Sequence, residues 1–304
     1  MKNLVKANNN LIENNINFSN LINSYLEYID VSENSLSTYK RCLKQFALYL
    51  NENGINQPTR EDIIAWKDYL MENNKPNTVN LYLVSVKSLF KWLEYMNIYK
   101  DITKNVKAIR MDKKHLKRGL TQEEVKLVLA QCKDIREEVI MKLLLTCALR
   151  ENELINIRLE DFYEENDSIM LKVMGKGRNG YKSDVVKVDN RIFNLIKEYC
   201  SIYNIQDYLF TSTSNHNNGG KLNSITIRRI VTNLFKKANL NMDRLSTHST
   251  RHFSATQALK SGMSLVEVSE MLRHSSTSIT QIYVDEIKAS ESRFANILTD
   301  LVMQ

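Results

Sequence analysis

The sequence has very little proline, glycine and cysteine for its length. Two prolines and eight glycines occur in 304 residues, so regular structure is rarely interrupted. The four cysteines form no CxxC pair, which disfavours a zinc finger or a disulfide framework and fits a reducing cytoplasm. No run of about 18 apolar residues occurs, so we expect no membrane-spanning helix. The Asn-rich N-terminus also lacks the apolar segment of a secretory signal.

The chain carries a modest excess of positive charge. It has 42 Lys and Arg against 35 Asp and Glu, a formal charge of +7, and a pI near 9.0. Such a chain is either an ordinary basic protein or a binder of a polyanion, with nucleic acid the first candidate. The charge alone does not decide between these two readings, and the length suffices for two ordinary domains.

Apolar residues at helical spacing dominate the first third of the chain. Residues 1–17 are polar and Asn-rich, and we expect them to be flexible. Residues 18–100 predict a module of four helices, one of which begins with a capping arrangement of Thr59 and Asp62. Residues 101–118 are basic with weak periodicity, which indicates a linker, either solvated or in contact with a polyanion.

A second module, residues 119–304, combines helices with one β signal. Two alternating runs, 168–174 and 182–188, flank a Gly-rich turn and predict an antiparallel hairpin or meander. That turn lacks the GxxxxGK[ST] pattern of a phosphate-binding P-loop. Helices account for the rest, so the fold class is mainly α with a small antiparallel β-sheet. The amphipathic C-terminal segment could pack on its own chain or on a neighbour.

The stretch STHSTRHFSAT allows two readings. His248 and His252 are four residues apart, as in a metal-binding helix, but position 249 is serine rather than a glutamate base, and no third ligand lies at metal-ligand spacing. His248 and Arg251, three apart, can instead face one anion, and an arginine fork suits a phosphate. The phosphate reading is favoured, and His252 faces either the site or the protein interior.

Two further segments hold candidate residues. Arg150 is predicted at the end of an apolar helix with Glu153 beyond it, and a charged arginine there needs a carboxylate or a phosphate as partner. His274 is followed nine residues later by Tyr283. Spacing alone gives Tyr283 no special role among 14 tyrosines.

Four motifs in this order carry a family resemblance: LTCALRENEL, MGKG, HSTRHFSAT and LRHSSTSITQIY. Their order and spacing resemble those of the tyrosine recombinases, the phage-integrase and Xer-type family. The resemblance spans a catalytic module from about residue 120 to 285. The helical module also looks like the family's SAM-like core-binding domain, so essentially the whole chain is covered. It implies a helical core-binding domain, an α+β catalytic domain, and a C-terminal partner-exchange tail.

The resemblance assigns roles residue by residue. It implies six catalytic residues, namely the two arginines, the hairpin lysine, the HxxR histidine, the histidine before the nucleophile, and the nucleophile: Arg150, Arg251, Lys176, His248, His274 and Tyr283. Glu153 would support the first arginine, and His252 is an uncertain support. Two departures stand out. The hairpin turn is longer than usual, so Lys182 rivals Lys176, and Arg273 replaces a frequent glycine, as a DNA contact or a neutral substitution.

The resemblance implies a site-specific recombinase that cuts and rejoins duplex DNA through a 3′-phosphotyrosine. No cofactor or metal is needed, because arginines would neutralise the phosphate. Expected partners are double-stranded DNA with a specific site, three further protomers in a tetrameric synapse, and possible accessory proteins, with no membrane.

Two other functions stay open, a type IB topoisomerase and an inactive DNA-binding regulator, with a metallohydrolase last. Only about 17 residues precede the first helix, which favours a simple Xer-like or inversion-type enzyme over one with an arm-binding domain. The sequence does not distinguish integration and excision, inversion, or dimer resolution.

Overall fold

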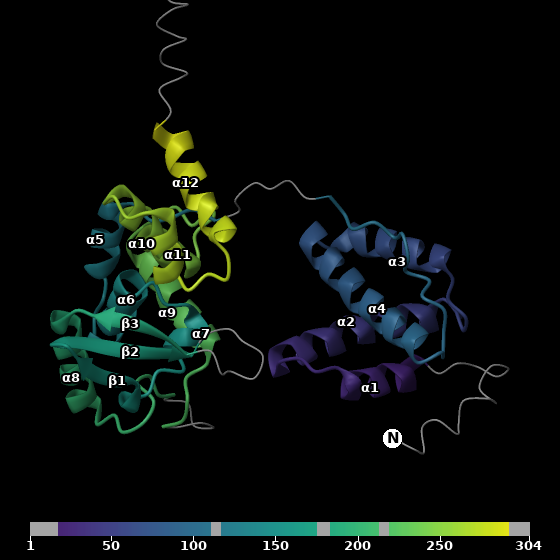
Figure 1. Cartoon of the computed structure of the whole chain (residues 1–304), viewed down its shortest axis with the longest axis horizontal. Helices are drawn as coiled ribbons and strands as arrows, with labels where there is room; N and C mark the ends of the chain where they lie inside the picture. The colour runs from purple at the N-terminus through teal and green to yellow at the C-terminus, as the bar shows by residue number, and fades with distance from the viewer. Residues whose placement is uncertain (1–17, 111–116, 175–182, 213–218, 292–304) are drawn as a thin grey trace, which may run out of the picture. The chain divides into compact units, whose positions relative to one another are not determined.

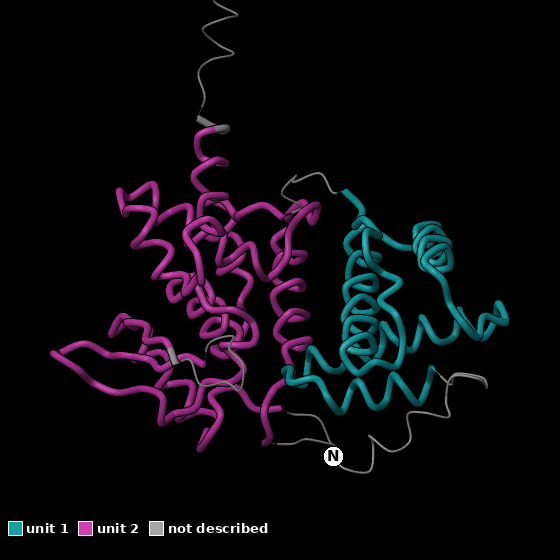
Figure 2. Tube along the Cα trace, turned by 45° about the vertical axis from the view of Figure 1, so that its right-hand side comes forward, with its two compact units in different colours: residues 1–114 teal, residues 115–304 magenta. Residues whose placement is uncertain are grey.

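The chain forms two compact units, residues 1–114 and residues 115–304 (Figure 2). The computed structural model describes residues 18–110, 117–174, 183–212 and 219–291. The prediction of a mainly helical fold with a small antiparallel sheet is confirmed. No helix in these described ranges is long and apolar enough to cross a membrane.

Between residues 18 and 110, the described part of the first unit, the chain forms four helices (Figure 1). They are α1 (Phe18–Tyr28), α2 (Glu33–Glu52), α3 (Arg60–Asn73) and α4 (Pro76–Tyr95). Local sequence sets their ends. Thr59 and Asp62 form a reciprocal capping box at the start of α3, as predicted. Gly54, just beyond α2, has a φ of 65°, a left-handed conformation that glycine adopts without steric cost.

The core of the first unit is aromatic. Phe46 lies edge-on to Trp66, with ring centroids 4.8 Å apart, and also to Phe90 at 6.1 Å. All three side chains are fully buried. The segment after α4 joins this core through Val106, which is 3% exposed. Part of the basic stretch after residue 100 is therefore folded onto the first unit.

The second unit contains the remaining elements. Its helices are α5 (Gln122–Leu129), α6 (Ile135–Thr146), α7 (Glu151–Leu154), the 3-10 turn η2 (Leu159–Asp161), α8 (Asn190–Tyr203), α9 (Ser224–Lys237), α10 (His248–Lys260), α11 (Leu265–Met271) and α12 (Thr277–Glu291). Its strands are β1 (Phe162–Glu165), β2 (Ser168–Met174) and β3 (Ser183–Val188). Capping boxes of Thr121 with Glu124 and of Ser264 with Glu267, patterns that local sequence alone displays, begin α5 and α11.

The three strands form one antiparallel sheet in the order β1-β2-β3. Leu171 pairs with Phe162 on one side and with Val186 on the other, and Leu171 is fully buried. The pairing of β2 with β3 confirms the predicted hairpin, whereas β1 was not predicted. β1 turns into β2 through Asn166 and Asp167, whose φ angles of 48° and 55° fit a two-residue hairpin turn.

Helix α6 is the centre of the second unit. It packs against α8 near the sheet and against α10 on the opposite side (Figure 1). Its buried side chains cover most of the circumference of the helix: Val139, Ile140, Met141, Leu143, Leu144 and Leu145. The partly exposed ion pair of Glu138 and Lys142 marks the remaining face. The rigid core therefore extends directly up to the turn that follows α6.

Candidate active site

The turn between α6 and α7 builds the centre of the site. The sequence predicted a helix running into Arg150, and this is wrong: α6 ends at Thr146. Ala148 has a φ of 47°, which breaks the helix, and Arg150 caps α7. The carbonyl of Ala148 accepts hydrogen bonds from two guanidinium groups, those of Arg251 and Arg273. These side chains satisfy a carbonyl that a continuing helix would have paired.

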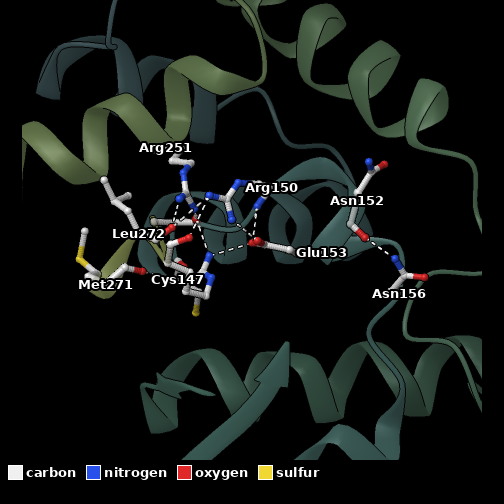
Figure 3. A network of polar contacts seen from close by, with 10 residues as sticks. Cys147, Arg150, Asn152, Glu153, Asn156, Arg251, Met271 and Leu272 are labelled. Carbon is white, nitrogen blue, oxygen red and sulfur yellow. Dashed lines mark hydrogen bonds and ion pairs between the residues drawn. The ribbon is translucent and has the colours of Figure 1, made fainter. Parts of the chain in front are cut away.

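Arg150 and Glu153 form an ion pair at this turn, joined by a second, main-chain hydrogen bond (Figure 3). The Arg150 backbone N–H donates to Glu153 Oε2 at 2.8 Å, and its guanidinium donates to Oε1. Arg150 Nη2 reaches the carbonyl of Leu272 at 3.4 Å. Burial favours a raised pKa for Glu153, but the charge of Arg273 and the hydrogen bonds from Arg150 and Arg273 lower it below its ordinary value. Glu153 is therefore an ionised carboxylate that holds Arg150 in place.

Arg251 comes from the first turns of α10 and meets the same turn from the other side (Figure 3). Its side chain is 2% exposed and donates to the carbonyls of Ala148 and Leu272. Burial and the charges of Arg150 and Arg273 lower its pKa to about 9, so Arg251 is still cationic at neutral pH. The two arginines share the Leu272 carbonyl, which brings together residues about a hundred positions apart.

The end of α11 places the next two residues. Arg273 N–H donates to Glu270 O at 2.8 Å, and His274 N–H donates to Ser269 O at 3.0 Å. This pair of bonds is the Schellman arrangement, in which the residue after the cap is left-handed and is usually glycine. Arg273 holds that position with a φ of 53°. The reversal turns the chain sharply, so that His274 enters the arginine cluster.

His274 is held as a neutral ring. Its Nδ1 lies 2.8 Å from Thr280 Oγ1, and Thr280 is fully buried. Burial lowers the pKa of His274, and the charges of Arg251, Arg150 and Arg273 lower it further, to about 4. At neutral pH the ring is uncharged, with one nitrogen bonded to Thr280 and the other able to contact a ligand.

Tyr283 lies on α12 beside the arginines. It packs against an apolar cluster that includes Ala148 and Leu272. Its ring stands edge-on to His252, with centroids 4.7 Å apart. Burial raises the pKa of Tyr283; the charges of Arg251 and Arg150 oppose this rise and that of Glu286 adds to it. The phenol is therefore protonated at neutral pH and needs a base in order to act as a nucleophile.

His252 contacts Tyr283 and ties α10 to α12. Its Nε2 lies 2.7 Å from a carboxylate oxygen of Glu286, one turn beyond Tyr283. A Cβ added to Gly119 would fall 2.7 Å from His252 Nδ1, so the ring fits closely against the backbone. The structure thus places His252 against the candidate nucleophile, a supporting position that spacing alone left undecided.

His248 begins α10 and remains accessible to solvent. Partial burial of its ring and the charge of Arg251 lower its pKa, while Glu151 acts in the opposite direction. Its ring is therefore mainly neutral at neutral pH and can accept a proton. Lys176 and its rival Lys182 lie outside the described residues. Within the part of the chain that the structure describes, no group of three or more His, Cys, Asp or Glu is placed to hold a metal ion.

Sequence reasoning missed two members of this site. Glu286 lies three residues after Tyr283, hence on the same helix face, and this spacing could have identified it. Arg273 was noticed only as a departure from the family pattern. The sequence does hold a signal for Arg273: it follows directly after the short helix α11, whose start is fixed by the Ser264 capping box.

Comparisons with known proteins identify the family of this chain. Residues 118–289 match the family model described as "Phage integrase family", and residues 22–96 match "Phage integrase, N-terminal SAM-like domain". A "Tyrosine recombinase" of Thermosipho africanus is 27% identical over 263 residues, covering 83% of this chain and 89% of its own. "Tyrosine recombinase XerA" of Pyrococcus furiosus is 29% identical over 286 residues, covering 92% and 94%.

Two solved structures share the fold. XerH site-specific recombinase bound to difH substrate, in a pre-cleavage complex, has a TM-score of 0.72 and 18% identity, covering 95% of this chain and 98% of its own. A lambda integrase tetramer bound to a Holliday junction has a TM-score of 0.70 and 15% identity, covering 92% and 80%.

Proposed function

The chain belongs to the phage integrase family and is a tyrosine-type site-specific DNA recombinase, and on that premise we propose how its own residues carry out the reaction. Tyr283 Oη attacks the scissile phosphorus, the bond to the deoxyribose 5′-oxygen breaks, and the DNA 3′-phosphate stays attached to Tyr283. A 5′-hydroxyl of another strand then reverses the reaction. The phosphotyrosine bond retains the free energy of the broken phosphodiester, so resealing needs no ATP.

One observation carries this proposal: Tyr283 packs on the apolar cluster that contains the two residues whose carbonyls orient the arginines. Ala148 and Leu272 belong to that cluster, and their carbonyls accept hydrogen bonds from Arg251, with Arg150 also bound to Leu272. A phosphate that meets both guanidinium groups would therefore lie beside the phenol. Preorganised cations at this position stabilise the charge that develops on the phosphoryl oxygens.

Proton transfers follow from the protonation states. Tyr283 keeps its proton at neutral pH, so attack needs an acceptor, and the accessible, neutral ring of His248 is the proposed base or shuttle. His274, fixed by Thr280, contributes a neutral hydrogen bond to the phosphate through its other nitrogen. Lys176 is the proposed acid for the leaving 5′-oxygen, with Lys182 as its rival.

The two alternatives are not favoured. An inactive DNA-binding regulator has no need of an arginine held by a buried carboxylate, Arg150 by Glu153, beside a tyrosine. A type IB topoisomerase would relax DNA without a specific site, whereas the relatives that span nearly the whole chain are tyrosine recombinases.

The proposed assembly is a tetramer on two copies of a specific duplex site, with accessory proteins possible. Residues 18–100 would serve as the core-binding domain and residues 119–304 as the catalytic domain. Residues 101–118 would form a linker that runs along the DNA backbone. In Figure 1, α12 runs out beyond α10 and α11, and its continuation is the proposed partner-exchange tail. Because the four cysteines are free thiols and the substrate is DNA, the proposed compartment is the cytoplasm.

A nicked duplex tests the chemistry. The site is first selected from random-sequence duplexes by binding to Tyr283→Phe protein, and cleavage is then measured in EDTA. Wild-type protein should form a covalent adduct, Tyr283→Phe should bind the DNA and form none, and Tyr203→Phe, at an exposed tyrosine of α8, should behave like wild type. An adduct in the Tyr283→Phe protein would refute the assignment, and loss of wild-type activity in EDTA would support a metal mechanism.

The tail is tested separately. Deletion of residues 290–304 should abolish synapsis of two sites while single-site cleavage persists. Unchanged synapsis would show that the tail packs on its own chain.

A further inference from the structure

Arg273 occupies a backbone position where an arginine is costly. It follows α11 at the left-handed residue of the Schellman turn, with a φ of 53°. In this conformation the Cβ atom of any residue other than glycine lies too close to the backbone, and glycine is the usual occupant. An arginine there introduces strain that the site needs to offset elsewhere.

The guanidinium group of Arg273 is buried and bonded on several sides. Its side chain is 3% exposed, and Nη2 lies 2.8 Å from Glu153 Oε2 and 2.9 Å from the carbonyl of Ala148. Nη1 donates to the carbonyl of Met271 at 2.9 Å and approaches that of Cys147 at 3.4 Å. These contacts and its burial keep the guanidinium group inside the protein, so we assign it a role other than a direct DNA contact.

Arg273 is linked to both arginines that the reaction uses. It shares the carboxylate of Glu153 with Arg150 and the carbonyl of Ala148 with Arg251. Loss of Arg273 would leave Glu153 paired with Arg150 alone, and the carboxylate would then offset half of the charge of the two arginines.

The net charge of the cluster explains how Arg273 could affect the reaction rate. Three guanidinium groups and one carboxylate leave two net positive charges in the cluster. A phosphodiester carries one negative charge in the ground state and gains a second when a phenolate attacks it. With Arg273 present, the cluster matches the charge of the transition state rather than that of the bound substrate, and such a difference accelerates the chemical step.

We propose that Arg273 is a positioning residue for the recombination reaction: its guanidinium neutralises Glu153 and orients Arg150 and Arg251, so that both keep their full charge for the phosphate. It acts through these groups without touching DNA. The inference rests on the proposed function.

Single-turnover cleavage of the nicked duplex at saturating DNA tests this role. Arg273→Met should lower the cleavage rate constant by about tenfold or more, the order expected for an electrostatic contribution, with the DNA Kd within about twofold of wild type. Arg273→Lys keeps the charge and should recover part of the lost rate. Arg191→Met, which removes an exposed arginine paired with Asp189, is the matched control and should leave the rate unchanged.

Arg273→Gly separates stability from the reaction. Glycine removes the backbone strain, so this variant should unfold at a higher temperature than Arg273→Met and still cleave as slowly. The charge of Arg273 also helps keep His274 neutral. In Arg273→Met the acidic limb of the cleavage pH profile should therefore move to higher pH.

Three results would overturn the inference. Cleavage rates that follow unfolding temperature, with Arg273→Gly fast and Arg273→Met slow, would mean that the residue only stabilises the fold. Rates within twofold of wild type in all variants would make it neutral, and a weakened DNA Kd with an unchanged saturating rate would make it a DNA contact. Absence of an adduct from the wild-type protein would instead refute the proposed function itself.

Discussion

Protonation of His274 should loosen the catalytic unit as the pH falls. The pKa of His274 is about 4 in the folded protein against an ordinary value of 6.5, because the ring is buried beside three arginines. A histidine with a depressed folded-state pKa takes up its proton more readily when unfolded. Its contribution to stability is therefore complete above pH 6.5 and is lost progressively as the pH falls towards 4.

The magnitude follows from the shift. At pH 5.0 an unfolded histidine is almost fully protonated while folded His274 is mostly neutral. The ordinary histidine pKa lies about 1.5 units above pH 5.0, and each unit corresponds to about 1.4 kcal/mol. About 2 kcal/mol of unfolding free energy is therefore lost between pH 7.5 and pH 5.0. Because the ring is partly accessible, solvent screening reduces this, and we expect a loss of about 1 to 2 kcal/mol.

The two units allow an internal control. Both tryptophans of the chain, Trp66 and Trp92, lie in the first unit, whereas His274 lies in the second. Hydrogen exchange in peptides from α10 to α12 reports the opening free energy of the second unit, and tryptophan fluorescence reports unfolding of the first. Comparing wild type with His274→Gln at each pH removes the contribution of every other titrating group.

The wild-type protein should lose more protection than His274→Gln in α10 to α12 as the pH falls. The fluorescence transitions of the two proteins should move together. If both proteins lose the same protection within about 0.3 kcal/mol, the scatter expected between independent sites, His274 is not held neutral by the arginines.

Three further changes test the contacts around this centre. Glu286→Gln removes the carboxylate that lies 2.7 Å from His252 Nε2, and should lower the opening free energy of α12, as read by hydrogen exchange, by about 1 kcal/mol; Asp285→Asn, on the same helix, should not. Gly119→Ala places a methyl group 2.7 Å from His252 Nδ1 and should lower the unfolding free energy by about 1 to 3 kcal/mol in chemical denaturation, and an unchanged value would mean that the ring moves freely. Glu153→Ala leaves Arg150 and Arg273 without their carboxylate and should lower the unfolding free energy by about 3 kcal/mol. Glu151→Ala breaks the pair with Arg228, whose side chain is 58% exposed, and should lower it by less than about 1 kcal/mol; equal losses would contradict the buried network.

Local sequence predicted the features that depend on neighbours in the chain. The capping boxes at Thr59, Thr121 and Ser264 need only residues three apart, so they were recognisable without a structure. The β2–β3 hairpin followed from alternating apolar residues. Strand β1 was missed because four residues are too few to establish a period, and its turn residues, Asn166 and Asp167, were not recognised as a hairpin signal.

The site depends on contacts between distant residues, which local patterns do not encode. The family resemblance singled out Arg150, Arg251 and Tyr283, but it did not indicate what holds them. The structure supplies that through two main-chain carbonyls, those of Ala148 and Leu272, which no side-chain pattern reveals. The expected helix up to Arg150 failed for the same reason: long-range bonds to the Ala148 carbonyl favour a left-handed residue where local propensity favours helix.

The thiol of Cys147 lies in the turn that holds the arginines, so its reaction rate reports how often that turn opens. The thiol is 2% exposed, burial raises its pKa, and the carbonyl of the same residue lies 3.4 Å from Arg273 Nη1. Only an accessible thiolate attacks an alkylating reagent, so this sulfur is protected as long as the turn is closed. The time that alkylation of Cys147 takes therefore measures how long the catalytic centre stays assembled between openings. This quantity is a time and not a free energy, and it can be compared with DNA bound and with DNA absent.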